Sequence, residues 1–298
     1  MNLNKVSEAL FQKFLSEKNK EKSERIILNV AIISFIVHLL IIGLVNFNFI
    51  QIDEPSNLLE NPIAAIYTPF SFILVYEVYL LIYYLPKSTS IYVSKQYEII
   101  TLIIFRRLFK DLSDLKLQAD WFHNKSDLQF TFDLITAIVL FYLIYLFHVY
   151  RRKINKSLIL KEPYSERISK FINIKKWIAI VLVPILVVIC FYSLIHWSFG
   201  LFQVGATETI SFKNINNIFF EQFFTILIIT DVFLLLFSFF HTDDFHKVIR
   251  NSGFIISTIL LRISFSVDGI INNLLIVTAV VFGLIIVLIH NKFEKHQV

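Results

Sequence analysis

The 298-residue chain is strongly apolar, with 56% hydrophobic residues, 32 phenylalanines and a mean hydropathy of +0.67. A soluble chain of this length rarely has such a composition, and several stretches reach the roughly 20 apolar residues that cross a bilayer core. A single cysteine, Cys190, excludes a disulfide framework and a cysteine metal cluster. The net charge of +5 lies mostly beside the apolar stretches, which favours anionic lipid headgroups over nucleic acid as partners. The composition therefore predicts an all-α polytopic membrane protein.

Residues 1–25 are polar and helix-prone, and they lack the short apolar core and small-residue cleavage site of a secretory signal. Leu10, Phe11, Phe14 and Leu15 fall on one helical face. This spacing predicts an amphipathic helix on the cytoplasmic surface of the membrane. The first span is then expected to be an uncleaved anchor.

The stretch Ile91–Leu112 decides the topology, because Lys95, Glu98, Arg106 and Arg107 interrupt its apolar residues. If this stretch only lay on the surface, the basic segments on either side of the following span would fall on opposite sides of the membrane. If it crosses, 21 of the 28 Lys and Arg residues are cytoplasmic, 4 are external and 3 lie within helices. The positive-inside bias therefore predicts that it crosses, with both termini cytoplasmic. The eight predicted spans are about residues 26–47, 64–85, 91–112, 130–150, 177–197, 218–240, 252–265 and 271–290.

The order of polar residues predicts an internal repeat. Three pairs of segments align, namely Val75–Tyr83 with Ile229–Phe237, Ile99–Arg106 with Ile255–Arg262, and Thr136–His148 with Thr278–His290. They place Glu77 on Asp231 and Arg106 on Arg262. The chain thus divides into two four-helix halves, residues 26–150 and 177–290, joined by a basic cytoplasmic linker at 151–176 and followed by a cytoplasmic tail at 291–298. An even number of spans gives the halves the same orientation, and we expect a two-fold axis along the membrane normal to relate them. A surface helix is predicted at Ser165–Ile172 in the linker.

Glu77 and Asp231 are the best candidates for chemistry, because each lies about halfway along an apolar helix. A charged carboxylate there costs on the order of 3 kcal/mol on insertion scales. One interpretation is a proton or cation site between the halves. The alternative is that each carboxyl stabilises its own bundle through a hydrogen bond.

Three arginines, Arg106, Arg107 and Arg262, lie toward the outer ends of their helices. They extend to outer phosphate groups, form an anion-attracting outer vestibule, or have a structural role. Arg106 is expected about 10–12 Å farther out than Glu77, which argues against a direct ion pair between them. Glu98, closer to Glu77 in depth, is a further candidate for an ion or proton site.

Histidines provide weaker candidates. His38, in the middle of the first span, is interpreted as an interhelical hydrogen-bond partner, with an ion or proton site as the alternative. The segment HTDDFH holds metal-ligating residue types, but its histidines, His241 and His246, are five apart and would point to different faces of a helix. We predict no metal and no cofactor.

Three functions remain open. Phosphate-binding loops and hydrolase or metalloprotease motifs are absent from the sequence. The first hypothesis is a small-ion or proton-coupled transporter or channel that uses Glu77 and Asp231. The second is a non-catalytic scaffold or assembly subunit that binds a partner protein or anionic lipid. The third is a lipid-handling enzyme. The abundance of Ile, Asn, Lys and Phe is typical of a bacterial protein, which favours the inner membrane.

Overall fold

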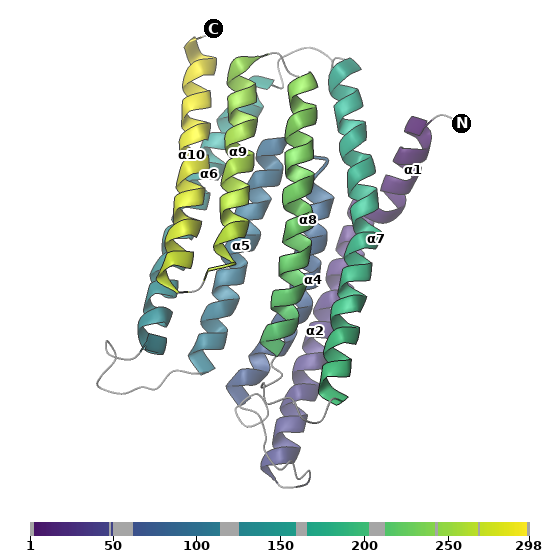
Figure 1. Cartoon of the computed structure of the whole chain (residues 1–298), viewed down its shortest axis with the longest axis vertical. Coiled ribbons are helices and arrows are strands. Elements are labelled where there is room, and N and C mark those ends of the chain that lie inside the picture. Colours follow the sequence, from purple (N-terminus) through teal and green to yellow (C-terminus); the bar gives the residue numbers. More distant parts are fainter. Residues whose placement is uncertain are drawn as a thin grey trace.

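The computed structural model describes residues 3–47, 49, 62–113, 125–158, 166–202, 212–241, 244–267 and 269–296, which form helices and turns with no strand among them. Figure 1 shows long helices that run roughly side by side. The helices are α1 (Leu3–Leu15), α2 (Glu17–Asn46), the short 3-10 helix η1 (Pro62–Ile66), α4 (Tyr67–Tyr84), α5 (Thr89–Ser113), α6 (Lys125–Leu158), α7 (Glu166–Phe202), α8 (Phe212–His241), α9 (Phe245–Ser264) and α10 (Ile270–His296).

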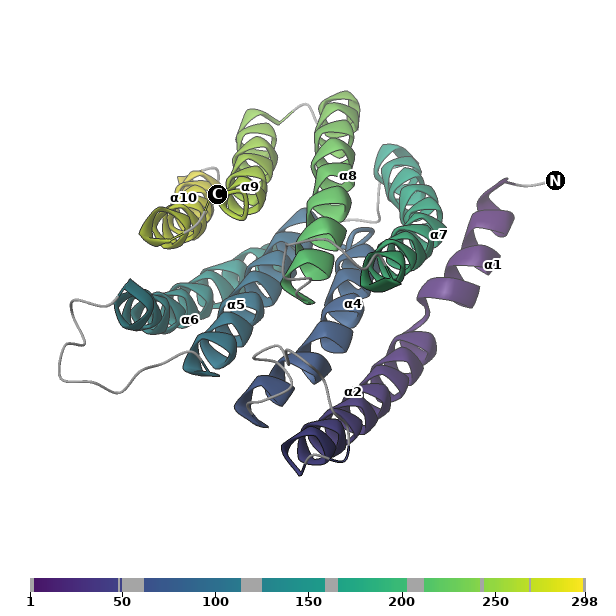
Figure 2. The ribbon, with the colours of Figure 1, turned by 60° about the horizontal axis from the view of Figure 1, so that its bottom comes forward.

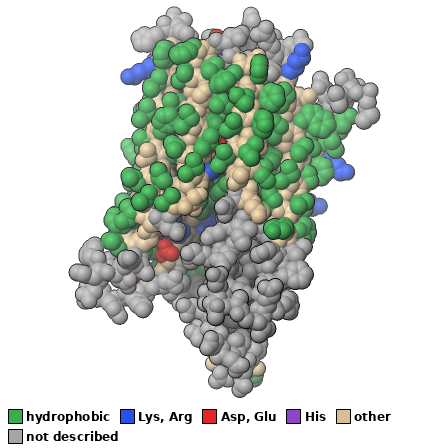
Figure 3. All heavy atoms as spheres, viewed as in Figure 1, with side chains coloured by type: hydrophobic (Ala, Val, Ile, Leu, Met, Phe, Trp, Pro, Cys, Tyr) green, Lys and Arg blue, Asp and Glu red, His purple; other side chains and the backbone are tan. Residues whose placement is uncertain are grey.

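Five segments are long and apolar enough to cross a membrane. They are Val6–Asn46, Asp127–Arg151, Ser169–Tyr192, Gln222–Phe240 and Ile270–Lys295, and α4 adds a shorter apolar helix at Thr68–Tyr84. On the face seen in Figure 3, hydrophobic side chains spread over the described helices. The fold is therefore all-α and compatible with a membrane protein. Each of the eight predicted spans falls largely on one of the helices α2 and α4–α10, but α4, α5 and α9 are not among the five segments.

The long helices form two rows. In the first row α2, α4, α5 and α6 pack in chain order, and in the second row α7, α8, α9 and α10 do the same. The rows pack against each other with α4 on α7, α5 on α9 and α6 on α10. Figure 2 shows that both rows run in the same direction. A two-fold axis would reverse one row and bring α6 beside α7, so the predicted two-fold relationship is wrong.

Helices were predicted at the N-terminus and in the linker, and the structure agrees with the first more closely than with the second. A helix at the N-terminus is confirmed as α1, and it ends where the Ser16 hydroxyl accepts a hydrogen bond from the Asn19 amide at 3.2 Å and caps α2. α1 packs on α7, where the hydroxyl of Ser7 donates to the Asn173 side chain at 2.6 Å. Residues 166–172 of the predicted linker helix are helical, but they form the start of α7, which begins at Glu166 and continues without a break.

The bundle has a basic end and an opposite end. The basic end carries Lys87 in the turn between α4 and α5, Lys176 near the start of α7, and Lys247 at the start of α9. At the opposite end α9 turns into α10 through Gly269, whose φ of 76° is accessible to glycine at little cost.

Candidate polar site between the helix rows

Helix α5 directs a polar face toward the second row. Tyr92, Gln96 and Arg107 lie within about 60° of one another around the helix, at 100° per residue. Tyr92 contacts α8, Gln96 contacts α9 and Arg107 contacts α10. Because this face packs against helices and not lipid, α5 does not need the hydropathy of a lipid-exposed span. The mean hydropathy of this stretch does not show that its polar residues lie on one face of the helix.

Asp231 on α8 is buried, with only 1% of its surface exposed, and contacts the first row through Tyr92 of α5. Its Oδ2 forms an ion pair with Nη2 of Arg262 on α9 at 2.9 Å. Its Oδ1 accepts a hydrogen bond from the Tyr92 hydroxyl of the first row at 3.1 Å. The Thr258 hydroxyl also lies 3.4 Å from Oδ2, although its one hydrogen is closer to the Ile255 carbonyl, at 2.9 Å. A buried carboxylate is thus compensated by one cation and by donors from both rows.

Arg262 is also bound from the first row. Its Nη2 donates to Oε1 of Gln96 at 3.0 Å, and its surface is only 4% exposed. The side chain therefore remains inside the bundle. The interpretation that Arg262 extends to phosphate groups, or lines an outer vestibule, is wrong.

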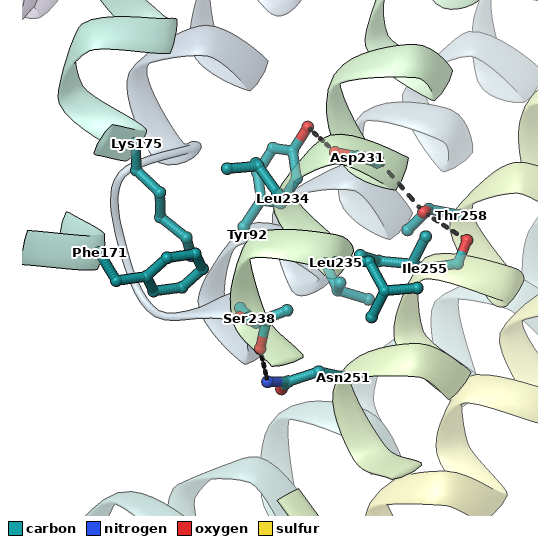
Figure 4. Close-up of a pocket in the computed structure, with 12 residues that line it drawn as sticks. Tyr92, Phe171, Lys175, Asp231, Leu234, Leu235, Ser238, Asn251, Ile255 and Thr258 are labelled. Atoms are coloured by element: carbon teal, nitrogen blue, oxygen red, sulfur yellow. Dashed lines mark hydrogen bonds between the residues drawn. The ribbon is translucent and has the colours of Figure 1, made fainter. Parts of the chain in front are cut away.

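A small cavity lies beside Asp231 on the side of the basic end (Figure 4). Its volume is about 20 Å³, which is enough for a water molecule or a monatomic ion but not for an organic substrate. Four helices line it, α5, α7, α8 and α9. The lining residues are Thr89, Tyr92, Val93, Phe171, Lys175, Asp231, Leu234, Leu235, Ser238, Asn251, Ile255 and Thr258.

Lys175 of α7 is a charged lining residue that was not among the predicted site residues, because its sequence position assigns it to the basic linker. It is only 5% exposed. Its Nζ donates to the backbone carbonyl of Lys87 at 3.3 Å and lies 4.9 Å from the centre of the Phe171 ring. In the part of the chain that the structure describes, no carboxylate forms an ion pair with it. A predicted helix that began one turn earlier would have placed Lys175 inside the bundle.

Glu77 and Arg106 form a second buried ion pair, between α4 and α5. Glu77 is 4% exposed and Arg106 is 9% exposed, and Nη1 of Arg106 also donates to the carbonyl of Phe70 at 3.1 Å. The prediction that these two residues would not meet is wrong, as are the lipid-phosphate and vestibule interpretations of Arg106. Side chains of a helix lean toward its N-terminus, and in an antiparallel hairpin this brings them toward each other.

Arg107 is held in a third polar cluster at the opposite end. Its guanidinium forms two hydrogen bonds with Asp133 of α6, at 2.5 and 2.8 Å. It also donates to Asn272 at 3.0 Å and to Asn273 at 2.5 Å, both on α10. Gln129 donates to Asp133 at 2.6 Å. The cluster joins three helices, and neither free extension to lipid nor a vestibule describes Arg107. Asp133 was not predicted as a site residue, although it lies at the matching end of the next helix.

The two remaining predicted site residues, His38 and Glu98, each contact a polar side chain of another helix. Nδ1 of His38 lies 2.5 Å from the Thr68 hydroxyl on α4, in agreement with an interhelical hydrogen bond. Glu98 pairs with Lys95 at 2.5 Å and with His148 at 2.8 Å. Among the described residues, no group of three His, Cys, Asp or Glu side chains could hold a metal ion. The side chains of His241 and Asp243 in the HTDDFH segment lie outside the described residues.

No family model, curated protein or solved structure matches the chain. Its class is therefore defined by its own features. These are an all-α fold with several helices suited to a membrane, and a polar site buried between two rows of helices.

Proposed function

We propose that all eight long helices cross the membrane and that the two rows are repeats of one four-helix unit. The aligned acids and arginines support this, because Glu77 pairs with Arg106 in the first row as Asp231 pairs with Arg262 in the second. The identical order of helices in the rows supports it as well. The repeats are then related by a shift of one row onto the next and not by a two-fold rotation.

We further propose that the protein is a transporter or channel for a small ion or for protons, and that Asp231 marks its ion-handling site. The observation that carries this proposal is the position of Asp231. It is buried, it binds groups of both rows, and it lines a cavity that reaches Lys175 near the basic end. Intramembrane ionisable residues beside a cavity are typical of ion pathways.

A line of polar groups extends this site toward the other end of the bundle. Gln96 and Arg262 follow Asp231, and the cluster of Arg107 with Asp133 lies farther along the same face of α5. A pathway between the rows would use these groups in that order. Glu77 lies within the first row alone, and we assign it a structural role.

A second candidate is a membrane scaffold, which the pairing of the interior charges favours. Glu77, Asp231 and Asp133 each pair with an arginine on a neighbouring helix. Such pairs fix the packing of helices in a protein that needs no moving ion. The two candidates differ in whether the Asp231 site conducts.

Flux in proteoliposomes tests the choice. Wild type, Asp231→Asn and Glu77→Gln would be assayed for proton, monovalent-cation and chloride flux, with Asp244→Asn as a matched control at an exposed position. We expect flux in wild type and in Asp244→Asn, and its loss in folded Asp231→Asn. Folded Glu77→Gln should still conduct. No flux in wild type for any of these ions would reject transport and favour the scaffold.

A further inference from the structure

We propose that the cavity beside Asp231 binds a small monovalent anion of the size of chloride, with Lys175 as its charged ligand. This inference rests on the proposed transport function for its purpose, but binding can be measured without transport. It also differs from the cation or proton site that the carboxylates suggest by themselves.

The charges around the cavity favour an anion. Asp231 and Arg262 form an ion pair at 2.9 Å, so their charges largely cancel. Lys175 then adds a positive charge that is 5% exposed and has no ion-pair partner in the described part of the chain. Burying an uncompensated charge is costly, and a bound anion would offset that cost. A cation would instead meet an excess of positive charge.

The hydrogen-bonding groups point to the same class of ligand. The ammonium of Lys175 has three N–H donors, and its one hydrogen bond, to Lys87, is long at 3.3 Å. Ser238 lines the cavity and accepts a hydrogen bond from Asn251 at 2.9 Å, so its own hydroxyl hydrogen can be directed inward. Thr89, whose side chain carries a hydroxyl, also lines the cavity. The cavity is thus lined by an ammonium and by hydroxyl-bearing residues that can donate to an anion.

Two more donors lie just beyond Asp231. Nη1 of Arg262 and Nε2 of Gln96 are buried, and within the described residues neither has a hydrogen-bond partner. Buried donors usually have partners, so this excess marks a place where an acceptor is missing. An anion that moved from Lys175 past Asp231 would meet these groups next.

Size restricts the anion. About 20 Å³ admits a monatomic ion but excludes phosphate, a lipid headgroup or an organic acid. The position near Lys87 at the basic end would raise the local concentration of anions at the entrance. Chloride and bromide are therefore the probes that fit.

The test is thermal unfolding of the full-length protein in detergent, with sodium chloride replaced stepwise by sodium gluconate at constant ionic strength. Gluconate is too large for the cavity. Chloride should raise the unfolding midpoint of wild type by about 2–4 °C, because ligands that bind only the folded state stabilise it. Lys175→Met should abolish this difference. Lys176→Met is the matched control, because this neighbouring lysine pairs with Glu8 and should keep the chloride effect.

Two results would overturn the proposal. One is a wild-type midpoint that is equal in chloride and gluconate, as expected if the cavity holds only water. The other is a chloride effect that survives in Lys175→Met. If Lys175→Met does not fold, bromide located by anomalous scattering in wild-type crystals decides, and no bromide peak beside Lys175 rejects the site. A chloride effect without any flux would support the anion site and reject transport. Proton or cation flux without a chloride effect would support transport and reject the anion site.

Discussion

Arg106 and Glu77 form an ion pair across the hairpin of α4 and α5, although Arg106 lies farther from the turn than Glu77 does. Each side chain leans toward the N-terminus of its own helix, so the two approach each other from opposite directions. Asp231 and Arg262 repeat this arrangement between α8 and α9. The difference lies in their surroundings, since Asp231 also receives a hydrogen bond from the other row.

Removing Glu77 is predicted to destabilise the protein strongly. In Glu77→Gln the guanidinium of Arg106 stays buried without its counter-charge, and the free energy of unfolding should fall by about 3–5 kcal/mol. Equilibrium unfolding in detergent measures this change. Glu98→Gln is the control, because Glu98 belongs to a partly exposed pair, which typically contributes about 0–1 kcal/mol.

The double variant Glu77→Leu, Arg106→Leu should be much more stable than the sum of the single changes implies. Replacing both partners leaves no uncompensated charge at this position in the bundle. If the losses in unfolding free energy of the two single variants add up to the loss of the double variant, the two residues do not interact in the membrane.

Gly283 on α10 is predicted to be intolerant of any side chain. A Cβ at this position would clash with the Tyr97 hydroxyl, and Tyr97 donates a hydrogen bond of 2.6 Å to Ser257, whose own hydrogen goes to the Ala279 carbonyl. Gly283→Ala should therefore cost about 1–3 kcal/mol or more in unfolding free energy. Gly43→Ala on α2 is the control, because a Cβ there would meet nothing within 4 Å and alanine favours a helix by about 0.5–1 kcal/mol.

Tyr97→Phe should partly rescue Gly283→Ala. The change removes the clashing oxygen and leaves the ring carbon at 3.0 Å as the nearest contact. A Gly283→Ala cost that is the same with tyrosine or phenylalanine at position 97 would show that α5 and α10 do not approach as the structure has them.

Asp133 is predicted to hold three helices together at the end opposite the basic one. Asp133→Asn keeps the shape of the side chain but removes the charge that binds Arg107, so unfolding free energy should fall by about 1.5–3 kcal/mol. Asp244→Asn, at an exposed position, should change it by less than about 0.5 kcal/mol. If the two variants have the same unfolding free energy, the ion pair of Asp133 with Arg107 does not stabilise the protein.

Much of the fold follows from local patterns. Apolar runs located the long helices, and the order of acid and arginine residues singled out Glu77, Asp231, Arg106 and Arg262, although it did not predict that they form ion pairs. The partner of Arg106 could have been predicted too, from the lean of side chains in a hairpin. Likewise, the spacing of Tyr92, Gln96 and Arg107 indicates a helix with one polar, buried face.

The arrangement of the rows and the cavity could not be predicted in this way. Whether the two rows stack in the same order or in reverse depends on how side chains of distant helices fit, as at Tyr97 and Ser257. Lys175 illustrates the same limit. Its charge places it in a basic linker, and only the packing of α7 against the α4–α5 turn buries it.

Helix α5 should cross the membrane despite its charges, because its polar face packs against the second row. Single cysteines would replace Ser88 and Ser113, at the two ends of α5, in a Cys190→Ala background, and a membrane-impermeant maleimide would label intact cells. Ser88 and Ser113 should give opposite labelling, while Lys247→Cys, at the basic end, should match Ser88. Equal labelling of Ser88 and Ser113 from one side would place both ends of α5 on that side. The stacking of α5 on α9 could then not exist in the membrane, and the proposed eight-span arrangement would be wrong.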